Sequence, residues 1–133
     1  MGINRDQEEE YQYKALTDRI IGCAIDVHTE LGPGLLESIY EEALTIELGE
    51  AGFLFQRQIE LPVTYKGRLL NGKFRADMVV ENTVVLELKS VQIMHPVFVA
   101  QLLSYMKMGG WKVGLLLNFG LPSLRDGLKR IVL

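Results

Sequence analysis

Two short apolar runs in the middle of the chain restrict its fold more than any other feature. The stretch FRADMVVENTVVLELKS, residues 74–90, carries them on either side of Glu81-Asn82-Thr83. Runs rich in β-branched residues around a short polar break predict two antiparallel strands joined by a hairpin. The chain therefore needs a sheet with a buried strand, although that strand region carries charged residues, namely Asp77, Glu87 and Lys89.

The segments before this hairpin predict two helices and a strand. Apolar residues recur at spacings of three or four from about residue 8 to residue 30, as in an amphipathic helix with one core face. A second helix is expected over residues 35–48, between the Gly-Pro-Gly break at residues 32–34 and Gly49. Residues 53–65 favour a strand, and Lys66-Gly67 and Asn71-Gly72 each predict a turn before Phe74.

The segments after the hairpin predict a third helix and another strand. His95-Pro96 is expected to start a helix that runs to about Met108, since proline is tolerated in the first helical turn. WKVGLLLNFG reads as a buried strand, and the tail SLRDGLKRIVL fits either a short helix or an added strand. The order helix, helix, three strands, helix, strand predicts a mixed α/β (α+β) fold, with a central mixed sheet of about four strands flanked by helices.

Length and composition favour one conventional domain. A chain of 133 residues leaves too little core for two domains, so we expect a single domain over residues 1–133, with residues 1–10 as a flexible or frayed N-terminus. The chain is 48% hydrophobic and 23% charged, has one cysteine, and shows neither a membrane-spanning run nor an export signal. A cytoplasmic location without membrane attachment is the expectation.

The charge distribution bears on possible partners. A net charge of −3 and a pI near 5.4 argue mildly against a protein that depends on phosphate contacts. The positive residues nevertheless gather in the middle of the chain, so a basic face is compatible with an acidic whole. These central cations are Arg57, Lys66, Arg68, Lys73 and Arg75.

The register of the hairpin decides where its charges lie. Side chains alternate along a strand, so Glu87 and Lys89 share one face of the second strand, opposite Leu86 and Leu88. If Glu81-Asn82-Thr83 is a three-residue loop, Val80 pairs with Val84, and Asp77 falls opposite Glu87 on the same face. A two-residue loop would instead put these two acids on opposite sides of the sheet.

Two carboxylates placed opposite each other suggest a metal site. Their Cβ atoms would be within about 5 Å, which destabilises a sheet unless positive charge lies between them. Mg²⁺ takes oxygen ligands and accepts one or two carboxylates while keeping several waters, and Lys89 would then stand beside a metal-bound water. This arrangement suits phosphodiester hydrolysis. The alternative is a solvated face in which Asp77, Glu87 and Lys89 form an ordinary cross-strand salt bridge.

The same residues carry a family resemblance. The spacing of Asp77 and Glu87-Leu88-Lys89 resembles the core of the PD-(D/E)xK nuclease superfamily, although Ala76 stands where that motif has proline. GLLESIY, residues 34–40, matches the signature of the small bacterial GxxExxY proteins, and the likeness extends from about Thr17 onward. The resemblance implies a restriction-endonuclease-like core and Mg²⁺- or Mn²⁺-dependent hydrolysis of nucleic acid, with DNA as the expected substrate.

The resemblance also assigns roles to residues outside the hairpin. Glu37 fits the helical glutamate that serves as a metal ligand or supporting acid; the alternative is a carboxylate stabilised by the helix dipole. Gln101 and Tyr105, four residues apart, resemble a Gln-x-x-x-Tyr element in which glutamine supports the site and tyrosine approaches DNA. They are alternatively a hydrogen-bonding residue at a sheet edge and a half-buried core aromatic. Arg75 and Lys73 are weaker candidates for nucleic-acid contact.

Three functions compete at this point. The first is a metal-dependent nuclease in which Asp77, Glu87 and Glu37 hold the ion, Lys89 lies beside the nucleophilic water, and Gln101 supports the site. The second is a catalytically inactive nucleic-acid or protein-interaction module that retains the fold. The third is a domain that acts only as a homodimer or within a larger complex, since a chain this small has little surface with which to grip a duplex.

Overall fold

The computed structural model describes residue 2 and residues 4–133, so the flexible N-terminal segment expected at residues 1–10 lies partly outside the described residues. The elements are α1 (Arg5–Leu31), α2 (Glu37–Glu50), β1 (Phe55–Tyr65), β2 (Arg68–Val80), β3 (Val84–Lys89), α3 (Pro96–Gly109), β4 (Val113–Asn118), η1 (Leu124–Gly127) and β5 (Leu128–Val132). The first helix begins earlier than the expected residue 8, because Asn4 and Gln7 form a capping box that satisfies its first amides.

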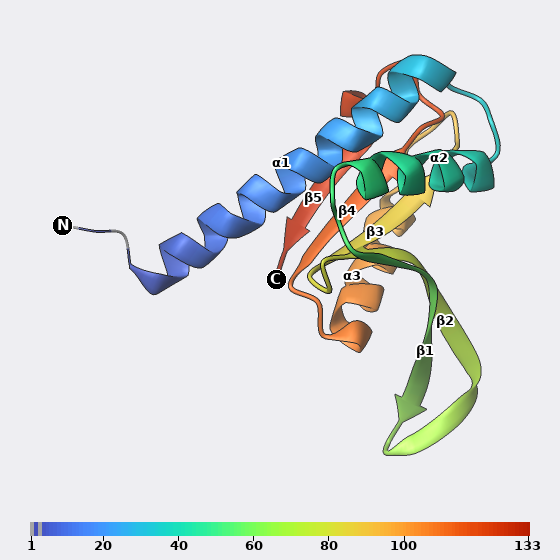
Figure 1. Ribbon diagram of the computed structural model, residues 1–133. Coiled ribbons are helices and arrows are strands. Elements are labelled where there is room, and N and C mark those ends of the chain that lie inside the picture. The colour runs from blue at the N-terminus through green and yellow to red at the C-terminus, as the bar shows by residue number, and fades with distance from the viewer. Residues whose placement is uncertain (1, 3) are drawn as a thin grey trace.

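The five strands form one sheet in the order β1-β2-β3-β4-β5. Neighbouring strands are antiparallel except β3 and β4, which are parallel and connected through α3. α1 and α2 cover one face of the sheet and α3 covers the other (Figure 1). The expected mixed architecture is thus confirmed. The ambiguous tail supplies both a 3₁₀ turn and a strand, which makes the sheet five-stranded rather than four-stranded.

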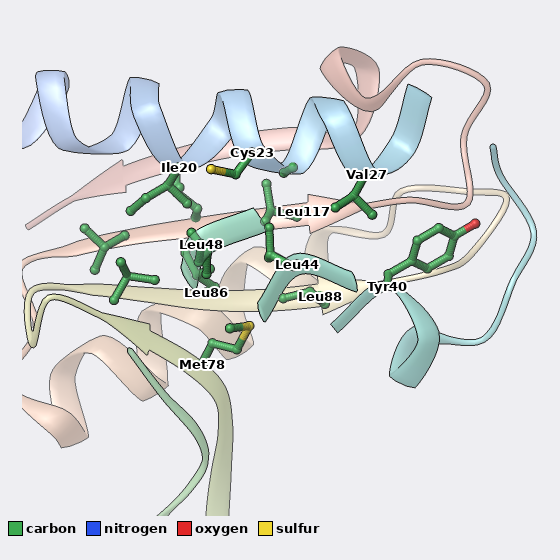
Figure 2. Packing of buried hydrophobic residues seen from close by; sticks show 14 of the residues in the cluster. Ile20, Cys23, Val27, Tyr40, Leu44, Leu48, Met78, Leu86, Leu88 and Leu117 are labelled. Atoms are coloured by element: carbon green, nitrogen blue, oxygen red, sulfur yellow. The ribbon is translucent and has the colours of Figure 1, made fainter. Parts of the chain in front are cut away.

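The larger core lies between the sheet and the α1–α2 pair (Figure 2). Alternate residues of β3 enter it, whereas Val85 faces the other side, as the alternation predicted. Burying each aliphatic side chain contributes on the order of 1.5–3 kcal/mol, so this layer holds the central strand in register. The side chains labelled in the figure are Ile20, Cys23, Val27, Tyr40, Leu44, Leu48, Met78, Leu86, Leu88 and Leu117.

A smaller core lies under α3. Leu102 and Met106 of this helix pack on the sheet face that contains Val85. The helix approaches β4 closely at Gly114, where a Cβ atom would meet Met106 Sδ at 2.7 Å. A side chain at that position would displace the Met106 side chain and crowd Leu102, so the glycine allows both to pack against the strand.

The β1–β2 hairpin is longer than the sheet that it joins. Lys66 and Gly67 form its turn with positive φ angles of 50° and 74°, as the type I′ preference of such loops predicts. The second predicted turn, at Asn71-Gly72, is wrong: both residues lie inside β2, beside the register shift between Pro62 and Thr64. The strands absorb the extra residues as a bulge and continue outward, so the ribbon extends away from the body (Figure 1).

None of the helices in the described part of the chain has the length and hydropathy required to cross a membrane.

Candidate active site

The acid pair lies where β2 leaves the sheet. Val80 pairs with Val84 and Met78 with Leu86, which confirms the register expected from a three-residue loop. The next position along this register would pair Asp77 with Glu87, but the backbone ladder has already ended. Instead, the Leu88 amide donates to Asp77 Oδ2 at 2.8 Å, so a side chain replaces the missing strand partner. The Asp77 carboxylate is therefore anchored to β3 beside Glu87.

Glu87 is buried next to this carboxylate. Its exposed fraction is 5%, and its Oε2 has no hydrogen-bond partner among the described residues. The pKa of Glu87 rises to about 9, first because of burial and then because the neighbouring Asp77 is negatively charged and accepts a hydrogen bond from the neutral acid. Burial also raises the pKa of Asp77, although the Leu88 amide opposes this shift. Without a cation, the pair holds a proton at neutral pH.

Lys89 is the cation nearest to the pair along β3. Its charge lowers the pKa of both Asp77 and Glu87, and its Nζ lies 4.9 Å from the centre of the Phe98 ring. No salt bridge within 4.0 Å joins it to an acid in residues 4–133. The alternative of a solvated face with a cross-strand salt bridge is therefore wrong, because Glu87 is buried and Lys89 is held over an aromatic ring instead.

Glu37 lies near the acid pair but does not join it. It is the exposed first residue of α2, and its charge contributes to the raised pKa of Glu87. Throughout the part of the chain that the structure describes, no three His, Cys, Asp or Glu side chains converge closely enough to hold an ion. The structure thus brings together Asp77 and Glu87 and leaves Glu37 outside the pair. Its role as a ligand remains a prediction.

The motif that contains Glu37 sets the start of α2. The Tyr40 hydroxyl donates to Gly32 O and accepts from the Leu35 amide, while its ring stacks on Phe119 with centroids 4.5 Å apart. Gly34 has a φ of 94°, a conformation that side chains disfavour. Tyrosine and glycine of Gly-x-x-Glu-x-x-Tyr therefore shape the loop that presents Glu37.

This loop is also tied to the end of β3. Ser90 Oγ donates to Leu35 O, and a shallow depression is lined by residues 35–38 together with Ser90. Glu37 consequently borders the same sheet end as Lys89.

Gln101 and Tyr105 lie four residues apart on α3, and Tyr105 lies near the acid pair. Gln101 Oε1 is buried without a hydrogen-bond partner in the described residues, so the expected hydrogen bond at a sheet edge is not seen for this atom. Tyr105 is half-buried and packs edge-on against Phe74, with centroids 5.4 Å apart. Burial raises the pKa of Tyr105, and the charges of Glu87 and Asp77 raise it further. Tyr105 therefore combines a packing role with a place beside the acid pair.

A second buried acid was not foreseen as part of the site. Glu41, 7% exposed and one turn after Glu37, accepts two hydrogen bonds from Arg57, at 2.8 and 3.0 Å, and one from Gln58. Its charge helps to raise the pKa of Asp77. Gln58 lies opposite Asp77, between the paired residues Arg57–Met78 and Ile59–Ala76, and has a φ of 51°. Glu41 thus braces β1 at the point where the acid pair forms. The i, i+4 spacing of Glu37 and Glu41 was the available signal.

The two weaker candidates for nucleic-acid contact lie on β2 before Asp77. Lys73 and Arg75 are exposed, and both approach Glu60, at 3.4 and 3.9 Å. Exposed pairs of this kind contribute little to stability, so both cations remain available to a partner.

The donors of the acid pair fit a divalent cation. Mg²⁺ and Mn²⁺ prefer oxygen ligands, and Mg²⁺ typically takes one or two carboxylates and keeps its remaining waters. A buried carboxylate oxygen without a hydrogen bond is costly unless a positive partner satisfies it, and Glu87 Oε2 is such an atom.

Comparison with known proteins agrees with this architecture. A mixed sheet with acids at the end of a central strand and helices on both faces is consistent with a restriction-endonuclease-like fold. The family model for the PD-(D/E)XK nuclease superfamily matches residues 14–131, and the chain therefore belongs to this superfamily. Neither a curated protein nor a solved structure matches it. Assignment to the GxxExxY proteins within the superfamily remains a prediction.

Proposed function

We propose that this protein is a Mg²⁺- or Mn²⁺-dependent nuclease that hydrolyses phosphodiester bonds in DNA. The observation that carries the proposal is Glu87 Oε2, a buried oxygen that accepts no hydrogen bond from the described residues. It lies beside a second carboxylate and beside Lys89, which has no salt bridge within the described part of the chain. Superfamily membership supplies the reaction class.

Asp77 and Glu87 would hold the ion, with Glu37, whose charge raises the pKa of Glu87, as a further ligand. When bound, the cation supplies Lewis-acid stabilisation of the phosphate and lowers the pKa of a coordinated water. Ionisation of Glu87 must accompany binding, so a proton leaves the pair when the ion enters.

Lys89 orients the scissile phosphate or the attacking water. Its ammonium is positioned over Phe98 without a competing acid within salt-bridge distance in the described chain, so its hydrogen-bonding capacity remains available to an anionic substrate. A preorganised donor of this kind contributes about 10²–10³-fold to a rate. Gln101 adds a buried amide oxygen that has no hydrogen-bond partner among the described residues and is therefore available to accept one from a water or a substrate group.

The test is cleavage of supercoiled plasmid with Mg²⁺ or Mn²⁺ by the wild type and by Lys89→Met. The methionine retains most of the aliphatic stem and loses only the ammonium. We expect cleavage to fall about 100-fold or more, while Lys129→Met, at an exposed position on β5, cleaves like the wild type.

Isothermal titration separates binding of the ion from catalysis. Asp77→Asn should abolish Mg²⁺ uptake, whereas Lys89→Met should retain it. Equal cleavage by Lys89→Met and wild type would remove the assigned role of the lysine. DNA binding that persists in chelator, without cleavage under any metal, would instead favour the inactive interaction module.

A further inference from the structure

Beyond Leu61 and Phe74, the β1–β2 hairpin has no packing partner among the described residues. We call residues 59–75 the arm. From Pro62 to Lys73 every residue is exposed except the half-buried Val63, and the ribbon extends beyond both helical layers (Figure 1). Large apolar side chains are exposed near its tip, with fractions of 62% for Tyr65 and 70% for Leu69. An isolated two-stranded ribbon is only marginally stable, so the length of the arm is not explained by a contribution to the core and indicates a role in binding.

The arm is basic within an acidic protein. It holds four Lys or Arg residues and one Glu, so its formal charge is +3, whereas the whole chain is −3 and the remainder is therefore −6. Glu60 lies beside Lys73 and Arg75, but Lys66 and Arg68 at the tip have no acid partner among the described residues. The net positive field thus lies on one projecting element and favours a polyanion there.

The acid pair lies at the base of the arm. Arg75 and Lys73 precede Asp77 by two and four residues on β2, which corresponds to about 7 and 13 Å along an extended strand. A polyanion on the arm therefore continues directly to Asp77. The brace from Glu41 to Arg57 and Gln58 fixes the direction in which the ribbon leaves the sheet.

The shape of the arm selects among polyanions. The major groove of B-form DNA is about 12 Å wide and admits a two-stranded β-ribbon. The major groove of A-form RNA is too deep and narrow for side chains to read. Phosphates flank the groove on both sides, where the tip cations would lie, while Tyr65 and Leu69 present apolar surface that suits thymine methyl groups.

We propose that the arm inserts into the major groove of double-stranded DNA and leads the backbone to the acid pair. This inference rests on the proposed function for its substrate, and it adds that the substrate is a duplex held by residues remote from the carboxylates. The acidic remainder of the surface repels the duplex elsewhere, so the arm also sets the orientation of binding.

The test is binding of a fluorescein-labelled 20-base-pair DNA duplex in EDTA, measured by anisotropy over a salt series. The variant is Lys66→Gln/Arg68→Gln, and the control is Lys129→Gln/Arg125→Gln, which removes the same charges from exposed positions near the C-terminus. Losing two phosphate contacts should raise the Kd about tenfold and lower the slope of log K against log salt by about 2. The control should change the Kd less than about twofold. Wild type should bind the RNA duplex of equal sequence at least about tenfold more weakly.

Equal weakening by the tip variant and the control, or equal binding of DNA and RNA duplexes, would overturn the inference. A wild-type dimer that Leu69→Ser dissociates would also overturn it, because the tip would then contact a second copy of the chain. Binding is measured without metal, so the result is independent of catalysis. If the tip variant weakens DNA binding but the protein cleaves no DNA, the proposed nuclease function is refuted and the role of the arm is supported. If cleavage depends on Lys89 but the tip variant binds DNA like the wild type, the role of the arm is refuted and the nuclease function is supported.

Discussion

Replacing Glu87 by glutamine should change how the stability of the metal-free protein depends on pH. The pKa of this acid rises from its ordinary value of 4.5 to about 9 in the folded chain, mainly because of burial and then because of Asp77. Between these values the folded state binds a proton that the unfolded state has released. The stabilising contribution of neutral Glu87 is therefore complete below pH 4.5 and is lost as the pH rises toward 9.

The magnitude follows from one linked proton. Inside this window the free energy of unfolding falls by about 1.36 kcal/mol for each pH unit, which gives about 2.7 kcal/mol between pH 6 and pH 8. Glutamine has the same shape, stays neutral and still donates to Asp77, so Glu87→Gln should lack this slope. Asp77 interacts with Glu87 and titrates together with it, so the difference between the two curves reports the proton held by the pair.

Urea denaturation in EDTA at pH 6, 7 and 8 measures both slopes. Glu42→Gln removes an exposed acid from α2 and serves as the control, with a pH dependence like that of the wild type. Curves for wild type and Glu87→Gln that run parallel from pH 6 to pH 8 would refute the assignment of a neutral buried Glu87. Adding Mg²⁺ should stabilise the wild type increasingly as the pH rises, since binding needs the ionised acid.

Three further substitutions test the surroundings of the site by urea denaturation at neutral pH. Glu41→Ala leaves its hydrogen-bond donors without an acceptor and should cost about 2 kcal/mol, moderated by solvent at the half-exposed arginine, whereas Glu42→Ala next to it should cost under about 0.5 kcal/mol; equal losses would contradict the brace. Tyr40→Phe should cost about 1–2 kcal/mol because two hydrogen bonds to the loop before α2 are lost, while Tyr11→Phe, an exposed position, should be neutral. Gln101→Met should raise the free energy of unfolding by about 1 kcal/mol, since it removes a buried acceptor that has no partner among the described residues; a decrease would show that the oxygen has one.

Local patterns predicted most of the elements, and they limited the register of the central hairpin to two alternatives. A three-residue loop pairs Val80 with Val84 and a two-residue loop does not, and the structure has the former. Local patterns failed at Asn71-Gly72, where a turn signal was absorbed into a bulge. Turn propensity is a local energy of about 1 kcal/mol or less, and pairing of the flanking strands outweighs it.

The hydrogen bonds from Arg57 and Gln58 to Glu41, beside Asp77, could not be predicted from residue spacing. Glu41 and Arg57 belong to different elements, so their contact cannot be predicted from local spacing. Gln58 adopts a left-handed backbone conformation, but glutamine, unlike glycine or asparagine, does not indicate that conformation in a sequence. The contact exists only because the tertiary structure brings Glu41 of α2 beside Arg57 and Gln58 of β1.

The sequence by itself determined that a central strand would carry Glu87 and Lys89 on one face, since that outcome depends only on strand periodicity, and it placed Asp77 beside them if the hairpin loop has three residues. The tertiary structure decided that Glu87 is buried, which raises its pKa and favours the protonated acid. It also decided that Glu37 lies outside the acid pair and that the basic β1–β2 ribbon projects from the site. Burial and electric fields are sums over neighbours from the whole chain, so they come into existence only when the helices close over the sheet.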